Sequence, residues 1–321
     1  MLPALARAWR LLLGYGFLIV LAAVFAFFSL ATDSFLTIGN VLAMLHAMAP
    51  LVIISCGMAL VVMAGKLDIS VGSIAFLSCA AGVILMREMG VPALAAAVII
   101  LAVGALLGAV NGLIVVVMRV NPLIATLGAM IAFRGLALEL TGARSHTLPD
   151  GVRELGNASI GPVFIDILVA AVVLVAAHIV HQRTPFGRQV TAIGNGDQIA
   201  ARVGIPVGRV VFLAFVLSGL LAALGGIVAS LQVGAVTAYL GKGLEFSAVA
   251  VVVVGGISLF GGRGSILQGV ALGALVFEMI RNGLNHLGAD PYSYRLVGGA
   301  VIFVAMYADA LKAGIGTRVR G

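Results

Sequence analysis

Residues 34–65 read SFLTIGNVLAMLHAMAPLVIISCGMALVVMAG and contain no Asp, Glu, Lys or Arg. These 32 residues exceed the roughly 20 apolar residues that a helix needs to cross a bilayer. The segment therefore predicts a membrane-spanning helix. Other runs without these charged residues are long enough to do the same, at residues 11–32, 69–86, 89–118 and 210–241. The sequence thus predicts an all-α polytopic membrane protein.

The composition excludes several classes of protein. Of the 321 residues, 62% are hydrophobic and only 10% are charged, whereas soluble domains carry about 25% charged residues. The mean hydropathy of +1.21 also excludes a disordered chain. The formal net charge is +7, but the basic residues are spread thinly between apolar runs and form no stripe with interleaved aromatic residues. We therefore expect contact with membrane lipid and with no nucleic acid.

Shorter runs interrupted by single charges bring the expected number of transmembrane helices to about ten. With this count, twelve Lys and Arg residues fall on the side of the two termini and four on the other, so the positive-inside rule places both the N and C termini in the cytoplasm. A single transmembrane domain then covers residues 1–321, with a cytoplasmic loop at about 183–209 and the longest external loop at about 142–162. The predicted spans are residues 11–31, 41–64, 70–86, 92–118, 122–141, 163–182, 210–232, 244–262, 264–282 and 294–311.

Proline and small residues predict how the spans are built. Pro50 falls inside the second span, where we expect it to kink or break the helix. Asn121 before Pro122 predicts an N-cap. Small residues at every fourth position predict static helix packing in preference to a moving interface. These stripes are Gly104, Gly108 and Gly112, and Ser218, Ala222, Gly226 and Ser230.

No pattern predicts catalysis, a metal site or a cofactor in this chain. The phosphate-binding pattern Gly-x-x-x-x-Gly-Lys-Ser/Thr does not occur in the sequence. His178 and His181 lack further ligands nearby, so they do not predict a metal site. Cys56 and Cys79 lie in apolar runs and are expected to behave as small hydrophobic residues.

Charged residues inside the predicted spans are more informative, because a charge in lipid is costly and faces a cavity or a partner. Either one of the carboxylates serves as a proton relay in a proton-coupled carrier, or Arg134 forms a structural ion pair with a carboxylate, and charge alone leaves both interpretations open. These residues are Arg134, Glu139, Glu245, Glu278 and Arg281.

The cytoplasmic loop at 183–209 contains one short predicted helix at residues 197–203. Asp197 is its predicted N-cap, and Gly204 its predicted stop. So short a helix is unstable alone in water, so it must dock on this chain or on a second protein. We expect it to dock through an apolar face formed by Ile199, Ala200 and Val203.

Four groups of motifs follow one another along nearly the whole chain. They are Leu67-Asp68-Ile69-Ser70-Val71-Gly72-Ser73; Asn121-Pro122-Leu123-Ile124-Ala125-Thr126-Leu127-Gly128 with Arg134-Gly135; Thr184-Pro185-Phe186-Gly187-Arg188 with residues 192–194 and 200–205; and residues 241–245 with 254–265. Together they resemble the permeases of ribose-type sugar ABC importers. Lys66 departs from the family pattern, which usually has glycine there.

The resemblance implies a multi-pass permease subunit in the bacterial inner membrane, part of an ATP-driven importer of a monosaccharide or related polyol. The implied partners are a second permease subunit of the same or a homologous chain, two ATP-binding subunits or one tandem ATPase, and an external sugar-binding protein. ATP and Mg would be bound by the ATPase partner. The resemblance therefore implies no cofactor and no catalytic residue in this chain.

Individual residues receive roles from this interpretation. The short cytoplasmic helix corresponds to the coupling helix that transmits ATPase motion, and the coupling residues are Arg188, Asp197, Ile199, Ala200, Ala201, Val203 and Gly204. The translocation pathway is expected on or beside Asp68, Ser70, Thr126, Arg134 and Glu245. The external loop is expected to receive the binding protein through Arg144 and Arg153.

Two alternative classes remain open. Permeases for branched-chain amino acids or nucleosides share the architecture but generally lack the pattern from Leu67 to Gly72. An ATP-independent secondary carrier would need inverted repeats and ion ligands at the midplane, and the sequence has no clear internal repeat.

Overall fold

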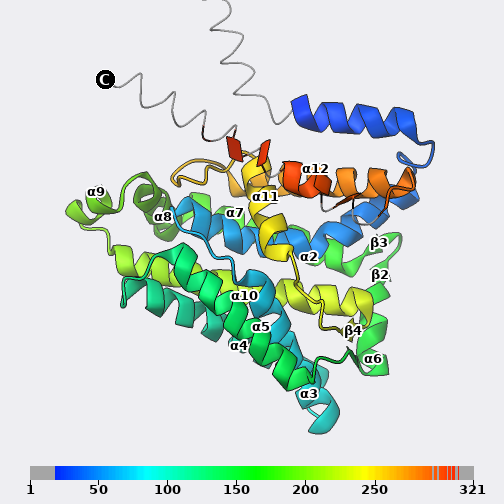
Figure 1. Cartoon of the computed structure of the whole chain (residues 1–321), viewed down its shortest axis with the longest axis horizontal. Coiled ribbons are helices and arrows are strands. Elements are labelled where there is room, and N and C mark those ends of the chain that lie inside the picture. The colour runs from blue at the N-terminus through cyan, green and yellow to red at the C-terminus, as the bar shows by residue number, and fades with distance from the viewer. Residues whose placement is uncertain are drawn as a thin grey trace, which may run out of the picture.

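The computed structural model describes residues 19–290, 293–294, 296–301, 303–304, 306–307 and 310, and this part of the chain is mostly helical (Figure 1). Two antiparallel strand pairs, β1 with β4 and β2 with β3, complete it. The helices are Ile19–Ala31, α2 (Ile38–Met63), α3 (Val71–Glu88), α4 (Ala93–Val116), α5 (Pro122–Thr141), α6 (Asp150–Arg153), η1 (Glu154–Asn157), α7 (Ile165–Arg183), α8 (Pro185–Asn195), α9 (Asp197–Arg202), α10 (Val207–Val233), α11 (Leu244–Val254) and α12 (Ile266–His286). The strands are β1 (His146–Thr147), β2 (Ser159–Ile160), β3 (Val163–Phe164) and β4 (Ala235–Val236).

Six helices in the described residues are long and apolar enough to cross a membrane, namely α2, α3, α4, α5, α7 and α10. This agrees with a polytopic membrane protein. The predicted span at 11–31 is described from residue 19 onward, as a shorter apolar helix. The predicted span at 264–282 coincides with the more polar α12. The one at 294–311 is described only in part, at residues 294, 296–301, 303–304, 306–307 and 310, which are helical.

The predicted span at residues 244–262 is wrong. α11 ends at Val254 after 11 residues, which is too short to cross a bilayer. The chain then turns, and Gly256, Gly261 and Gly262 adopt φ angles of 88°, 84° and 67°. Glycine adopts this left-handed conformation readily, whereas a helix excludes it. The apolar run therefore continues through a glycine-rich turn and not through a helix.

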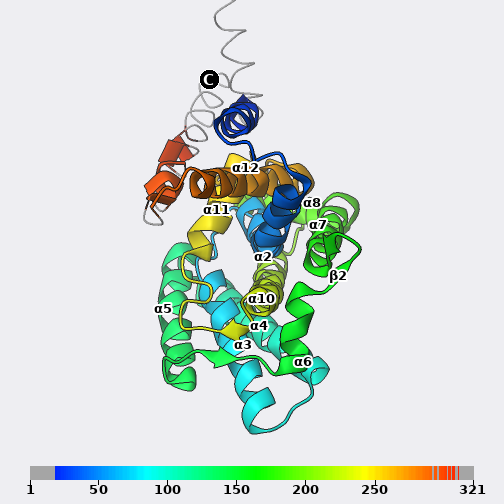
Figure 2. The same cartoon turned by 90° about the vertical axis from the view of Figure 1, so that its right-hand side faces the viewer.

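α10 lies at the centre of the bundle (Figure 2), packed on α4, α2 and α3. A Cβ atom added at Gly108 of α4 would collide with the backbone oxygen of Phe215 in α10. A Cβ atom added at Gly57 of α2 would lie 2.9 Å from the Cα atom of Ser218. The predicted small-residue stripes are thus confirmed as the surfaces at which neighbouring helices approach one another closely.

α2 runs unbroken across Pro50, so the predicted break does not occur. Pro50 has no amide hydrogen, which leaves the carbonyl of His46, four residues earlier, without its helical partner. The Nε2 atom of Gln232 in α10 donates a hydrogen bond to this carbonyl at 2.7 Å. A neighbouring helix therefore replaces the bond that the proline removes, as occurs in membrane bundles.

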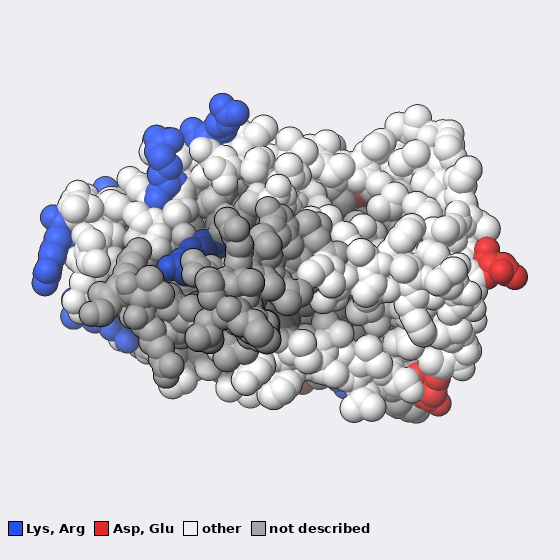
Figure 3. Space-filling model, turned by 90° about the horizontal axis from the view of Figure 1, so that it is seen from above, with Lys and Arg blue, Asp and Glu red and all other residues white. Residues whose placement is uncertain are grey.

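The two ends of the bundle differ in structure and charge. α8 and α9 form one end, while the strands and α6 form the other (Figure 1). On the face shown in Figure 3, Lys and Arg side chains gather at the α8–α9 end and acidic side chains at the opposite end. The predicted external loop at 142–162 lies at this second end and contains β1, α6, η1 and β2, so much of it is regular structure.

Candidate functional site

Three segments that are far apart in the sequence meet beside α8 and α9. We call their meeting point the glycine junction, and it comprises residues 63–66, 194–197 and 255–264. The backbone N–H of Gly262 donates a hydrogen bond to the carbonyl of Met63 at 2.9 Å. A Cβ atom added at Gly194 would collide with this same carbonyl oxygen. Backbone packs directly on backbone at this point, which only glycine permits.

α9 begins at the glycine junction, but Asp197 is not its N-cap as predicted. The N-cap residue is Gly196, and no side chain caps the helix. The carboxylate of Asp197 instead accepts a hydrogen bond from Lys66 Nζ at 2.7 Å, which forms an ion pair. The predicted stop is confirmed, because Gly204 follows the helix with a φ of 84°.

The apolar face predicted for α9 is divided between two surfaces. Ala200 is only 3% exposed and packs against its own chain, whereas Ile199 and Val203 are 67% and 72% exposed. The reason is helical geometry, since residues 199 and 203 lie four apart on one face and residue 200 points elsewhere. Ala201 and Arg188 of α8 are also exposed at this end. Ala200 therefore packs inside this chain and does not belong to the exposed surface of α9.

Asp68, Ser70 and Thr126 are fully buried around the connector between α2 and α3. The Oδ1 atom of Asp68 accepts hydrogen bonds from the backbone N–H of Ser70 at 3.1 Å and from Ser70 Oγ at 2.6 Å. The Oδ2 atom accepts a third from Ser218 Oγ of α10 at 2.9 Å. Asn111 Nδ2 of α4 donates to Ser70 Oγ at 2.7 Å. We call these hydrogen-bonded residues the Asp68 network, and it joins the start of α3 to α4 and α10.

Two members of the Asp68 network were not predicted as site residues. Asn111 is a lone amide in a long run without charges, and a polar residue inside a span is itself a signal of a partner. The sequence identifies Ser218 only as a small residue of a packing stripe. Thr126 attaches α5 to the same connector, because its Oγ1 atom accepts a hydrogen bond from the backbone N–H of Ile69 at 3.2 Å.

Arg134 and Glu245 lie on the other side of the first turns of α3. Glu245 packs directly against Gly72, where an added Cβ atom would collide with Glu245 Oε2. The guanidinium of Arg134 lies 5.3 Å from the centre of the Phe76 ring, and its Nη2 atom donates to the carbonyl of Leu240 at 3.2 Å. Within the described residues, Arg134 Nη1 and Glu245 Oε2 are buried without a hydrogen-bond partner. All five predicted pathway residues therefore gather around the start of α3.

One of the carboxylates considered for a proton relay, Glu278, forms an ion pair within its own helix. Arg281 donates two hydrogen bonds to the carboxylate of Glu278, at 2.9 and 2.7 Å, within α12. The predicted structural pair was a different one, between Arg134 and a carboxylate. Arg134, in contrast, forms no ion pair with a carboxylate in the described part of the chain.

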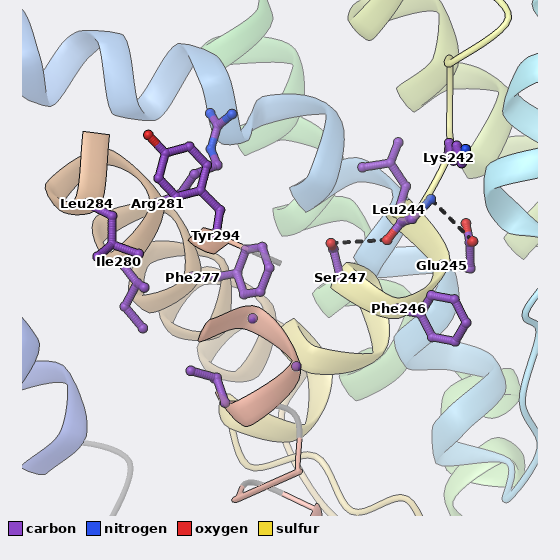
Figure 4. Close-up of a pocket in the computed structure, with 14 residues that line it drawn as sticks. Lys242, Leu244, Glu245, Phe246, Ser247, Phe277, Ile280, Arg281, Leu284 and Tyr294 are labelled. Carbon is purple, nitrogen blue, oxygen red and sulfur yellow. Dashed lines mark hydrogen bonds between the residues drawn. The ribbon is translucent and has the colours of Figure 1, made fainter. Parts of the chain in front are cut away.

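A cavity of about 660 Å³ lies between α11, α12 and residues 294–301. Glu245 and Ser247 line it on one side and Arg281 on the other (Figure 4). The carboxylate of Glu245 accepts a hydrogen bond from the N–H of Gly243 at 3.2 Å, on the far side from Arg281 (Figure 4). The other four predicted pathway residues do not line this cavity.

The two arginines predicted to receive a binding protein lie at the opposite end from α9. Arg144 and Arg153 are both exposed. Arg153 also forms an ion pair with Asp150 within α6, at 3.4 Å. A solvated pair of this kind contributes little to stability, so Arg153 remains accessible to another charge.

Comparison with known proteins shows that this chain is similar to transport permeases. The family profile described as "Branched-chain amino acid transport system / permease component" matches residues 40–306. The probable ABC transporter permease protein YphD of Escherichia coli (strain K12) is 38% identical, over 92% of this chain and 89% of that protein. The ribose import permease protein RbsC of the same strain is 34% identical over 95% and 96%, and the D-allose transport system permease protein AlsC is 32% identical over 92% and 91%.

One solved structure, "PsaBC from Streptococcus pneumoniae in complex with Fab", aligns with a TM-score of 0.47 and 17% identity, over 89% of this chain and 94% of that one. This likeness is too low to bear on the fold.

A helical bundle with several membrane-spanning helices and a buried polar site defines an integral membrane transport subunit. The chain belongs to the permease family whose profile covers most of its length. It is thus an inner-membrane transport permease and not an enzyme. Permeases of this kind work with separate ATP-binding and substrate-binding partners.

Proposed function

We propose that this chain is the permease subunit of an ATP-driven importer that moves a monosaccharide or related polyol across the inner membrane. Two similar permeases are named for ribose, a pentose, and D-allose, a hexose. The structural observation that carries the proposal is the gathering of polar side chains around the start of α3, inside an otherwise apolar bundle. A hydroxyl-rich solute needs such donors and acceptors to leave water.

The proposed pathway uses these polar residues in two ways. Arg134 and Glu245 each have a buried polar atom that forms no hydrogen bond with any described residue, and sugar hydroxyls both donate and accept hydrogen bonds. We assign them to contact with the sugar. Ser70 donates a hydrogen bond to Asp68, and Thr126 accepts one from the backbone of the α2–α3 connector. We therefore assign Asp68, Ser70 and Thr126 to holding this connector in place beside the pathway.

The proposed coupling surface is the exposed side of α9 together with α8. Ile199 and Val203 offer apolar contacts to an ATP-binding subunit, and Ala201 and Arg188 border them. Asp197, Ala200 and Gly204 hold and terminate α9 on its own chain.

The proposed assembly contains a second permease subunit, two ATP-binding subunits or one tandem ATPase, and an external sugar-binding protein. ATP and Mg²⁺ are bound by the ATPase, with no cofactor in this chain. We place both termini and the basic α8–α9 end in the cytoplasm, following the positive-inside rule. Arg144 and Arg153 then face outward, where they meet acidic groups of the binding protein.

A branched-chain amino acid is the second candidate substrate, because the matching family profile carries that description. An amino acid brings a carboxylate and an ammonium group, which Arg134 and Glu245 would pair with directly. The two candidate substrates therefore differ in their ionised groups, since the amino acid carries two and the sugar none. A transport assay distinguishes them.

The test is uptake into vesicles that contain the complete transporter, with ribose, D-allose or leucine supplied through the binding protein. We expect ATP-dependent uptake of a sugar and none of leucine. An Ile199→Asp variant is expected to stay folded but to lose about tenfold or more of this uptake, as for a central interface residue. Ile199→Leu, which keeps an apolar side chain at the same exposed position, serves as the control. Uptake of sugar by the permease without ATP, or of leucine alone, would contradict the proposal.

A further inference from the structure

The ion pair between Lys66 and Asp197 joins two segments that are 131 residues apart. Two other ion pairs, Arg153 with Asp150 and Arg281 with Glu278, connect residues one turn apart in a single helix. His46 and Asp166 also join distant segments, but as an ion pair only when the imidazole is protonated. Lys66 and Asp197 instead connect the α2–α3 connector to α9, with Nζ and Oδ2 2.7 Å apart. Their side chains are 19% and 46% exposed. The pair therefore contributes to how two elements are placed more than to folding.

Lys66 extends from a rigid backbone position. The N–H of Gly65 donates to the carbonyl of Val62 at 2.8 Å, and the N–H of Lys66 donates to the carbonyl of Val61 at 3.1 Å. With Gly65 at a φ of 71°, these bonds form the Schellman motif that terminates α2. The base of the Lys66 side chain is thus fixed to the end of a buried transmembrane helix.

Asp197 also extends from a rigid unit. The N–H of Gly204 donates to the carbonyl of Ala201 at 3.0 Å, and the N–H of Ile205 donates to that of Ala200 at 3.1 Å. This second Schellman motif closes α9 into a compact turn. A force on one side of α9 therefore moves Asp197 along with the whole helix.

The connector continues directly from Lys66 into the Asp68 network. Only Leu67 separates Lys66 from Asp68, whose carboxylate is bonded to Ser70 and to Ser218 of α10. Lys66, one member of the ion pair, is thus two residues from Asp68, whose buried hydrogen bonds hold the start of α3.

We propose that Lys66 and Asp197 are positioning residues that tie α9 to the α2–α3 connector, so that movement of α9 is passed to the start of α3. The proposal rests on the proposed function, since the force on α9 comes from an ATP-binding subunit. A partner that pushes on Ile199 and Val203 then displaces Lys66 through Asp197. Without the ion pair, α9 moves on the glycine junction while the connector stays in place.

Amide hydrogen exchange in residues 197–203 of the purified permease tests the tie itself. Lys66→Met keeps the length of the side chain but removes its charge, and we expect faster exchange by up to about fivefold, the factor that a partly exposed ion pair supplies. The double variant Lys66→Asp, Asp197→Lys restores opposite charges and is expected to restore slow exchange. Arg202→Gln, which removes a cation without an ion-pair partner in the described residues, is the control. Unchanged exchange in Lys66→Met would overturn the proposal.

The number of ATP molecules hydrolysed per ribose imported by the complete transporter tests the consequence. We expect Lys66→Met to raise this ratio by about fivefold, a typical size for coupling between sites, and the double variant to return it toward the wild-type value. A merely structural residue would instead lower the amount of folded permease at an unchanged ratio, and that result also overturns the proposal. If the wild-type complex imports no ribose, the proposed function fails, while the exchange measurement still decides whether Lys66 holds α9.

Discussion

Asp68 shows how one residue can connect several helices. Its carboxylate has no exposed surface and accepts hydrogen bonds from Ser70 and Ser218. The charge is held by three donors, which offset part of the cost of burying it. Removal of the carboxylate leaves those donors buried and unpaired, which costs more than the loss of one donor.

We therefore expect Asp68→Ala to destabilise the permease by about 3 kcal/mol or more, because each unpaired buried donor costs about 1–3 kcal/mol. Ser218→Ala removes a single hydrogen bond and is expected to cost about 1 kcal/mol. Ser29→Ala, which removes an exposed hydroxyl bonded within its own helix, is the control. Thermal unfolding in detergent gives the order of the three midpoints. Equal midpoints for Asp68→Ala and Ser29→Ala would show that the network is not structural.

At this scale the sequence predicts local contacts and misses distant ones. The Asn121 cap is confirmed, since its side chain accepts a hydrogen bond from the N–H of Leu123, two residues on. Asp197 is also placed for capping, but its carboxylate pairs with Lys66, far away in the chain. The polarity of Asp68 and Ser70 was recognisable, whereas Asn111 and Ser218 became their partners only through the packing of α4 and α10.

The helices themselves are largely predictable, because long apolar runs with caps have few alternatives in a membrane. α11 is the exception, since apolar residues continue beyond its end through glycines whose conformation only the fold decides. The small-residue stripe of α4 did predict a packing surface, and Gly108 lies where that helix closely approaches α10. Glycine has a different role in α5, where a Cβ atom at Gly128 would meet no atom within 4 Å.

These two glycines give a prediction with opposite signs. Gly108→Ala is expected to destabilise the isolated permease by about 1–3 kcal/mol, because the added methyl group forces α4 and α10 apart. Gly128→Ala is expected to be neutral or to stabilise by up to about 1 kcal/mol, since alanine favours a helix over glycine. Unfolding of both variants in the same detergent measures the difference. Shifts of equal sign and size would contradict the close α4–α10 packing.

On the face of the molecule shown in Figure 3, basic side chains gather at the α8–α9 end and acidic ones at the other end. This separation runs along the direction of α2 and α10 (Figure 1), as expected for helices that cross a membrane with one basic side. The number of spans was hard to predict from the sequence, because α12 is more polar and α11 shorter than a typical span.

Labelling of intact cells with a membrane-impermeant maleimide tests this orientation. We expect Arg153→Cys to react from outside and Arg202→Cys to react only after the membrane is opened. The native Cys56 and Cys79 are both buried, so they provide a low background. The reverse pattern, with Arg202→Cys labelled in intact cells, would mean that the α8–α9 end faces outward.

The hydrogen bond from Gln232 to the carbonyl of His46 limits which motions this permease can use. A slide of α2 along α10 by one helical turn would carry that carbonyl about 5 Å away from Gln232 and break this hydrogen bond. We therefore expect α2 and α10 to move together as one rigid body. The hinges must lie where backbone bonds are already irregular, such as the connector after α2 and the glycine turn after α11.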